Sequence, residues 1–172
     1  MPYPLHPAVV HFPIVLSFLV PAFAVWAFVR DGRKPPGHSP VWPVVVVLCA
    51  ALVATSYLAI NTGGRQVDKV KRVVPQKAIH AHEEAADRVM IGAILCLAGA
   101  LGGLMAGRTG RVARGVTVGL SLLMISAVGR TAQLGGALVY EDGAASAYTS
   151  GACDSPRTEK PPAEDHDGRA PS

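Results

Sequence analysis

Four long apolar segments, almost free of charged residues, limit the structures that this chain can adopt. They are Val9–Val29, Val41–Ile60, Val89–Gly107 and Gly115–Tyr140, and only the fourth contains a charge. About 20 apolar residues in a helix cross the hydrocarbon core of a bilayer, and a helix satisfies its own backbone there. We therefore predict an all-α integral membrane four-helix bundle, with helices at about 9–29, 41–60, 84–107 and 115–140.

The charged residues gather outside these segments. They make up 16% of the 172 residues, below the roughly 25% of a soluble domain. Residues 141–172 are polar, with seven acids and three bases, and lack apolar periodicity. We predict a transmembrane domain over 1–143 and a disordered polar tail over 144–172. The bases upstream flank apolar segments instead of lining a soluble face, so we expect the lipid bilayer, and no nucleic acid, as a partner.

The distribution of bases also predicts orientation. The connections around 30–40 and 108–114 hold six bases in short loops, whereas the six in 61–88 are spread over a longer one, and none precedes the first apolar segment. By the positive-inside rule both termini lie outside, in a multi-pass protein of the cell inner (plasma) membrane. The N-terminus lacks the basic start and clear cleavage site of a signal peptide, so we expect His6 and His11 in the mature protein.

Antiparallel helices would bring most of the histidines to one face of the membrane. The start of the first helix, the end of the second, the start of the third and the end of the fourth meet there. They contribute His6, His11, Asn61, Thr62, His80, His82, Glu83, Glu84, Asp87, Arg130, Gln133 and Tyr140. Heights from the helical rise match His6 with His82, and place His11 near Asp87 and Arg130 at the membrane edge.

Each of these residues also has a structural interpretation. Arg130 would pair with Asp87 or Glu84, or extend outward, although an intramembrane charge is a functional candidate by default. The segment from His80 to Glu84 would be the solvent-exposed start of the third helix, and it contains no HExxH motif.

Glycines spaced by four residues predict close helix packing. Gly99, Gly103 and Gly107 would share one face of the third helix, and Gly115 and Gly119 one face of the fourth. Cys49 and Cys96 lie in apolar segments, and the chain has no CxxC pair, so neither a disulfide framework nor a c-type haem site is predicted.

The two ends of the apolar region resemble a bacterial family. Leu5-His6-Pro7-Ala8-Val9-Val10-His11-Phe12-Pro13-Ile14 and Leu134-Gly135-Gly136-Ala137-Leu138-Val139-Tyr140 are similar to motifs of the domain of unknown function 2231 family, over roughly residues 3–145. The resemblance implies four membrane helices. Related domains joined to Rieske or cytochrome c modules imply electron transfer and redox partners. Many members carry histidine where Gln133 and Asp142 stand here.

Two functions from different classes fit these observations. The first is an electron-transfer component that binds haem b, held by His6, His11 or His82 with Arg130 near a propionate, or a transition metal, held by His6, His11, His80 and His82. The second is a non-catalytic membrane subunit or scaffold whose histidines are structural. An ion pathway through His11, Asp87 and Arg130 is a weaker third. Without a nucleophile triad or phosphate loop, we assign no catalytic residue and do not favour an enzyme.

Overall fold

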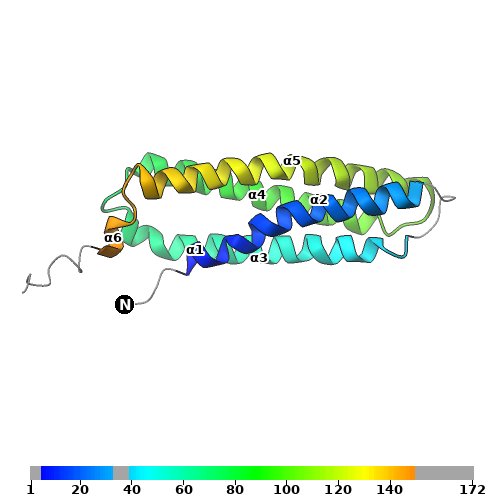
Figure 1. Cartoon of the computed structure of the whole chain (residues 1–172), viewed down its shortest axis with the longest axis horizontal. Coiled ribbons are helices and arrows are strands. Elements are labelled where there is room, and N and C mark those ends of the chain that lie inside the picture. The colour runs from blue at the N-terminus through cyan, green and yellow to red at the C-terminus, as the bar shows by residue number, and fades with distance from the viewer. Residues whose placement is uncertain (1–4, 33–38, 150–172) are drawn as a thin grey trace, which may run out of the picture.

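The computed structural model describes residues 5–32 and 39–149, and it is all-α in this part of the chain (Figure 1). Four long helices run antiparallel, with one short helix before the first of them in the chain and one after the last. The helices are α1 (His6–Val9), α2 (His11–Gly32), α3 (Trp42–Val70), α4 (Gln76–Gly102), α5 (Gly107–Tyr140) and α6 (Ser146–Thr149).

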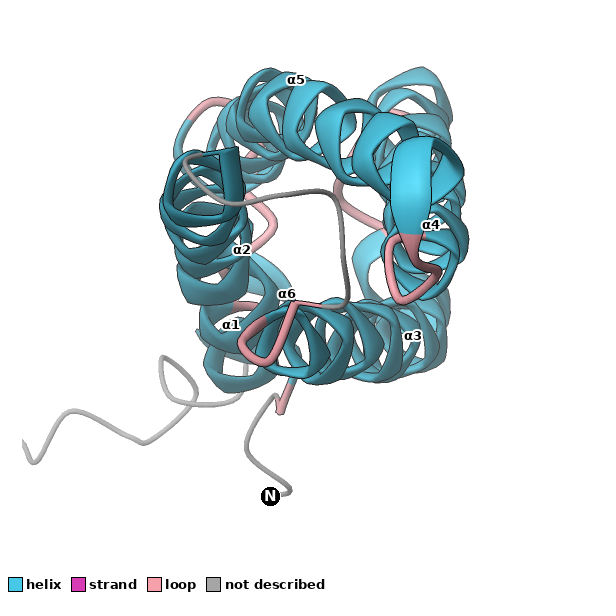
Figure 2. Cartoon of the chain, turned by 90° about the vertical axis from the view of Figure 1, so that its right-hand side faces the viewer, coloured by secondary structure: helices cyan, strands magenta, loops and turns pink. Residues whose placement is uncertain are grey.

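The long helices form a closed ring when viewed along the bundle (Figure 2). Helix α2 packs against α3 and α5, and α4 packs against the same two helices from the other side. Consecutive helices are neighbours in space, as in an up-down-up-down bundle. The predicted fold is therefore confirmed. For the site, the important consequence is that α1 and the start of α4 lie at the same end of the bundle.

Small side chains fill the interior of the bundle. The inward stripes recur every three or four residues, the spacing of one helical face. The buried positions are Val20, Ala24 and Ala27 of α2, Val45, Cys49 and Leu52 of α3, Ala93, Cys96 and Ala100 of α4, and Thr117, Ser121 and Met124 of α5. Small residues allow helix backbones to approach closely where lipid supplies no hydrophobic drive for association.

The outer surface of the bundle is apolar, the reverse of a soluble protein. Leu123 is 69% exposed, Val47 66% and Ile91 58%. Four helices are long and apolar enough to cross a membrane, with spans His6–Asp31, Trp42–Val70, Gln76–Gly102 and Gly107–Tyr140. Contiguous apolar surface of this extent needs an apolar environment. The chain is thus a multi-pass membrane protein with four candidate spans in its described residues.

The helices extend beyond the predicted apolar segments. Helix α3 continues ten residues past Ile60, α4 begins at Gln76, and the first two turns of α5 lie in the segment predicted as a loop over 108–114. At 1.5 Å per residue the 34 residues of α5 reach about 51 Å, against a hydrocarbon core of about 30 Å. Hydropathy marks where a helix leaves lipid, whereas the backbone hydrogen bonds continue into water.

A second small core closes the end of the bundle that carries His6 and His82, which we call the histidine end. Val74, Ile79 and Ala144 are buried there, and Val67, Val70 and Leu138 pack against them. The Tyr148 hydroxyl lies 3.1 Å from the Gln66 side-chain oxygen. The tail predicted to be disordered from 144 therefore begins with a packed segment through α6, and its remainder, 150–172, lies outside the described residues.

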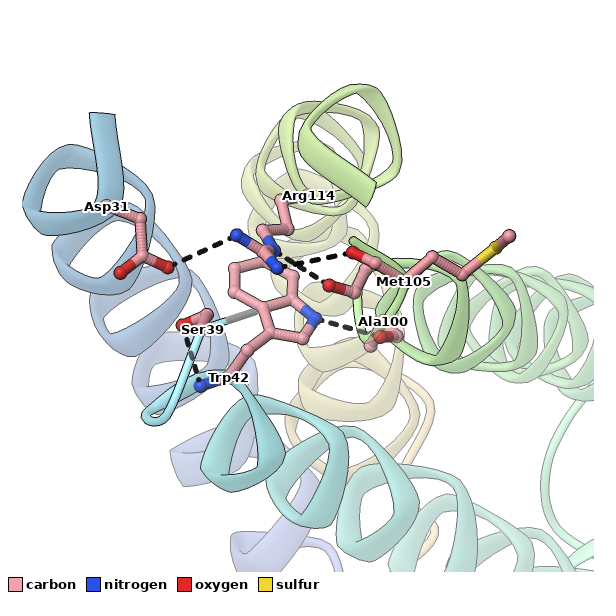
Figure 3. Close-up of polar contacts among 7 residues, drawn as sticks. Asp31, Ser39, Trp42, Ala100, Met105 and Arg114 are labelled. Atoms are coloured by element: carbon pink, nitrogen blue, oxygen red, sulfur yellow. Dashed lines mark hydrogen bonds and ion pairs between the residues drawn. The ribbon is translucent and has the colours of Figure 1, made fainter. Parts of the chain in front are cut away.

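The opposite end, which we call the arginine end, is joined by a buried network around Arg114 (Figure 3). This residue is 5% exposed, and its Nε donates to the Gly103 carbonyl at 2.7 Å. Its Nη1 pairs with Asp31 at 3.4 Å, and its guanidinium lies 5.7 Å from the centre of the Trp42 ring. The Trp42 indole in turn donates to the Ala100 carbonyl at 2.8 Å. The network connects all four long helices.

The predicted glycine contacts are confirmed in part. A Cβ at Gly99 would lie 2.7 Å from the Thr117 hydroxyl, and one at Gly103 would collide with the Trp42 ring. Gly107 instead begins α5 with φ of +76°, a conformation that suits glycine. Gly119 has nothing within 4 Å of an added Cβ, so its predicted role in close packing is wrong.

Candidate functional site

His6 lies on the short helix α1 and contacts the C-terminal half of α3. Its Nδ1 is 2.9 Å from the Ala59 carbonyl oxygen and 3.4 Å from the Thr62 hydroxyl. A turn at Val10 lies between α1 and α2, three residues before Pro13, whose nitrogen has no proton to donate to the helix. The Val10 amide still donates to the His6 carbonyl at 3.1 Å, and its carbonyl accepts from Ile14 at 3.3 Å. Helix α1 therefore continues into α2 through one irregular turn and places the His6 ring against α3.

His82 lies in the second turn of α4 and contacts the C-terminal third of α5. Its Nδ1 is 3.2 Å from the Thr131 carbonyl oxygen. Like His6, it is half-buried. Each imidazole therefore forms the same interaction, a hydrogen bond from Nδ1 to a backbone carbonyl of a neighbouring helix.

The two imidazoles lie next to each other at the histidine end, in a T-shaped arrangement. Their ring centroids are 6.4 Å apart, and the ring planes are nearly perpendicular at 84°. A carbonyl oxygen can only accept, so Nδ1 must carry the proton in both rings. In a neutral imidazole the other nitrogen, Nε2, then has a free lone pair. An Nδ1–H bonded to a carbonyl is also the usual support of a histidine that ligates a metal through Nε2.

The separation of the ring centroids is compatible with one metal ion held between the two imidazoles. Two metal–nitrogen bonds of about 2.0–2.1 Å, and about 1.1 Å from each nitrogen to its ring centre, give roughly 6.3 Å between centroids when both Nε2 atoms point at the metal. The observed 6.4 Å is close to this value, and it also lies in the range of a T-shaped contact between two rings. In the described ranges, no three His, Cys, Asp or Glu side chains are grouped to hold a metal ion. A structural zinc ion takes four protein ligands and a catalytic one three, whereas haem iron needs only two axial ligands from the protein.

The other predicted site residues lie elsewhere. His11 is exposed at the start of α2, and Arg130 is exposed on α5, beside the residue whose carbonyl binds His82. His80 is exposed, with its Nδ1 3.2 Å from Glu83. The predicted set of four histidines is thus not gathered into one metal site. Glu84, one of the predicted partners of Arg130, forms an ion pair with Arg88 of its own helix at 3.1 Å.

A buried hydroxyl lies one helical turn deeper than the imidazoles. Ser56 is 4% exposed, on the inward stripe of α3 three residues before Ala59, and its Oγ has no hydrogen-bond partner among the described residues. Hydroxyls in helices commonly bond a carbonyl one turn back, as Thr55 and Thr62 do here. A buried polar atom without a partner marks a place where a water or ligand atom is accommodated.

Two glycines that the sequence analysis did not assign to the site form its walls. A Cβ at Gly63 would lie 3.1 Å from Cε1 of His6, and a Cβ at Gly135 would lie 3.1 Å from Cε1 of His82. A signal was available in the sequence, since Gly63–Gly64 and Gly135–Gly136 are doublets near the ends of two helices that finish at the histidine end.

Comparison of the chain with protein-family models, curated proteins and solved structures finds no match.

Proposed function

We propose that this protein is an electron-transfer component that binds haem b between His6 and His82. The observation that carries the proposal is the pair of imidazoles, each with Nδ1 bonded to a backbone carbonyl and with centroids 6.4 Å apart. A bound haem would supply an iron that alternates between two oxidation states. The chain would supply two axial nitrogens and a low-dielectric surrounding.

The immediate surroundings of the two rings are small residues. Ala59 and Ala85 are buried small side chains near the two rings, and Gly63 and Gly135 contact the imidazoles. The absence of bulky side chains at these positions leaves the helix backbones as the walls of the site. The unpartnered Ser56 hydroxyl adds a polar atom that a ligand or its bound water would satisfy.

The position of the site at one end of the bundle would let a partner outside the membrane exchange electrons with it. The positive-inside rule supports a histidine end on the outer side of the plasma membrane, with both termini outside. A partner that exchanges electrons there would be a soluble or anchored redox protein. The resemblance to the domain of unknown function 2231 family, whose relatives occur with Rieske or cytochrome c modules, supports a partner of that type. Reporter fusions within residues 33–38 and at residue 172 would test the orientation.

The deciding experiment is a reduced-minus-oxidised absorption spectrum of protein expressed with added haem and purified in mild detergent, with haem and metal content measured on the same sample. We expect one haem per chain and a Soret band that His6→Ala and His82→Ala both abolish. His11→Ala and His80→Ala are the matched controls and should retain it. Stoichiometric copper without haem would make the pair a copper site. Protein with neither would leave the histidines as a structural clamp in a scaffold subunit.

A further inference from the structure

The two halves of the bundle repeat the same arrangement around their histidines. In the first half, His6 bonds the carbonyl of Ala59, and Gly63 lies four residues after that acceptor. In the second half, His82 bonds the carbonyl of Thr131, and Gly135 again lies four residues after it. Residues four apart share a helix face, so in each half the ring lies over the glycine and reaches the carbonyl of the preceding turn.

The glycine in each half leaves room that a side chain would take. A Cβ at Gly63 would lie 3.1 Å from Cε1 and 3.2 Å from Nδ1 of His6. A Cβ at Gly135 would lie 3.1 Å from Cε1 and 3.5 Å from Nδ1 of His82. Optimal contacts between carbon atoms are about 3.5–4.0 Å, so either Cβ would push the ring away from its carbonyl. The second glycine of each doublet, Gly64 or Gly136, would have nothing within 4 Å.

Within each doublet, only the first glycine lies against an imidazole ring. The contrast shows that glycine is required at that position, and that the second position has room for a larger residue. Glycine weakens a helix relative to alanine, so its presence beside each ring calls for a compensating reason. The close approach of the imidazole supplies that reason at Gly63 and Gly135 only.

We infer that Gly63 and Gly135 are positioning residues that fix His6 and His82 in the same tautomer, which would make the two imidazoles equivalent ligands of a bound haem. The inference rests on the proposed function and narrows it. If both histidines held the haem, no position would remain for an added ligand, and the group would serve electron transfer instead of dioxygen binding.

The positioning role can be tested before any ligand is added. Nitrogen-15 NMR of histidine-labelled apoprotein in detergent reports which ring nitrogen carries the proton. We expect His6 and His82 both as the Nδ1–H tautomer. Gly63→Ala should convert the His6 signals to an average of two tautomers and leave His82 unchanged, and Gly135→Ala should do the reverse. Gly64→Ala and Gly136→Ala are the matched controls. Unchanged tautomers in Gly63→Ala and Gly135→Ala, or equal changes in the controls, would overturn the inference.

The equivalence of the ligands is tested on the haem-loaded protein with carbon monoxide, which binds reduced iron only where an axial position is open. The wild-type spectrum should not change on exposure to the gas, whereas Gly63→Ala or Gly135→Ala should give a carbon monoxide complex or a shifted reduction potential. A complex in the wild type would refute two equivalent ligands and leave haem binding intact. Protein that retains no haem would refute the proposed function and the axial arrangement together, while the NMR result would still decide whether the glycines position the rings.

Discussion

Arg114 offers the sharpest test of how this bundle is held together. Its side chain is 6% exposed, its ion-pair partner Asp31 is 12% exposed, and Nε donates to the Gly103 carbonyl at 2.7 Å. Replacing Arg114 by Met keeps much of the aliphatic stem and removes the guanidinium. The substitution leaves a largely buried carboxylate and a helix-end carbonyl without these bonds.

The expected loss of stability follows from these contacts. Removing one partner of a buried ion pair costs about 3–5 kcal/mol, since the other charge stays buried without compensation. Asp31 retains some access to solvent, so we expect Arg114→Met to lose about 3 kcal/mol of unfolding free energy, at the lower end of that range. Asp31→Asn also removes the pair but leaves the bonds from Arg114 to backbone carbonyls, so it should cost less.

The measurement is reversible unfolding in mixed micelles of mild detergent and dodecyl sulfate. Far-ultraviolet circular dichroism would report it, because the described part of the chain is all-α and the signal does not depend on Trp42. The exposed Arg108 gives the matched control, and Arg108→Met should change stability by no more than about 0.5 kcal/mol. The double variant Asp31→Asn with Arg114→Met should show a coupling of about 0.5–3 kcal/mol. A loss below about 1 kcal/mol for Arg114→Met would refute the argument that the network holds the arginine end closed.

Three further predictions use the same unfolding assay. Gly99→Ala should cost about 1–3 kcal/mol by overpacking against its threonine neighbour on α5, whereas Gly119→Ala, with open space, should be neutral or stabilising; equal effects would contradict the packing argument. Trp42→Phe should cost about 1–3 kcal/mol, because the Ala100 carbonyl loses its indole donor, and a neutral result would mean that this bond contributes little. Ser56→Ala should stabilise the apoprotein by about 1 kcal/mol by removing an unpartnered buried hydroxyl; a loss of stability would show that the hydroxyl has a partner in solution.

The sequence predicted the four spans because charge is excluded from lipid, and the apolar segments record that exclusion directly. It predicted the ends of the helices poorly for the same reason. Residues 61–70 are polar or mixed, yet they continue α3, since Val67 and Val70 pack into the small core at the histidine end. Tertiary packing of this kind does not appear in hydropathy.

The sequence predicted the heights of the site residues along the bundle, but not the rotation of each helix about its own axis. Counting residues along antiparallel helices matched His6 with His82, and their rings lie 6.4 Å apart. The acceptor carbonyls and the glycines depend on which way each helix faces, and backbone acceptors have no sequence signature. Arg114 was interpreted as a signal of topology because a base at the end of a span supports the positive-inside rule whether its side chain is buried or exposed.

The two imidazoles share their chemistry but differ in how firmly they are anchored. His82 is the seventh residue of the 27-residue helix α4, whereas His6 is the first residue of α1, at the N-terminal end of the first span. A rigid planar molecule wider than the gap between the rings can enter only if one of them moves aside, and a terminal helical turn frays more readily than a turn with helix on both sides. The N-terminal segment would therefore set the rate of loading and release. A covalent crosslink between α1 and α3 should block uptake by the apoprotein without altering the spectrum of protein already loaded.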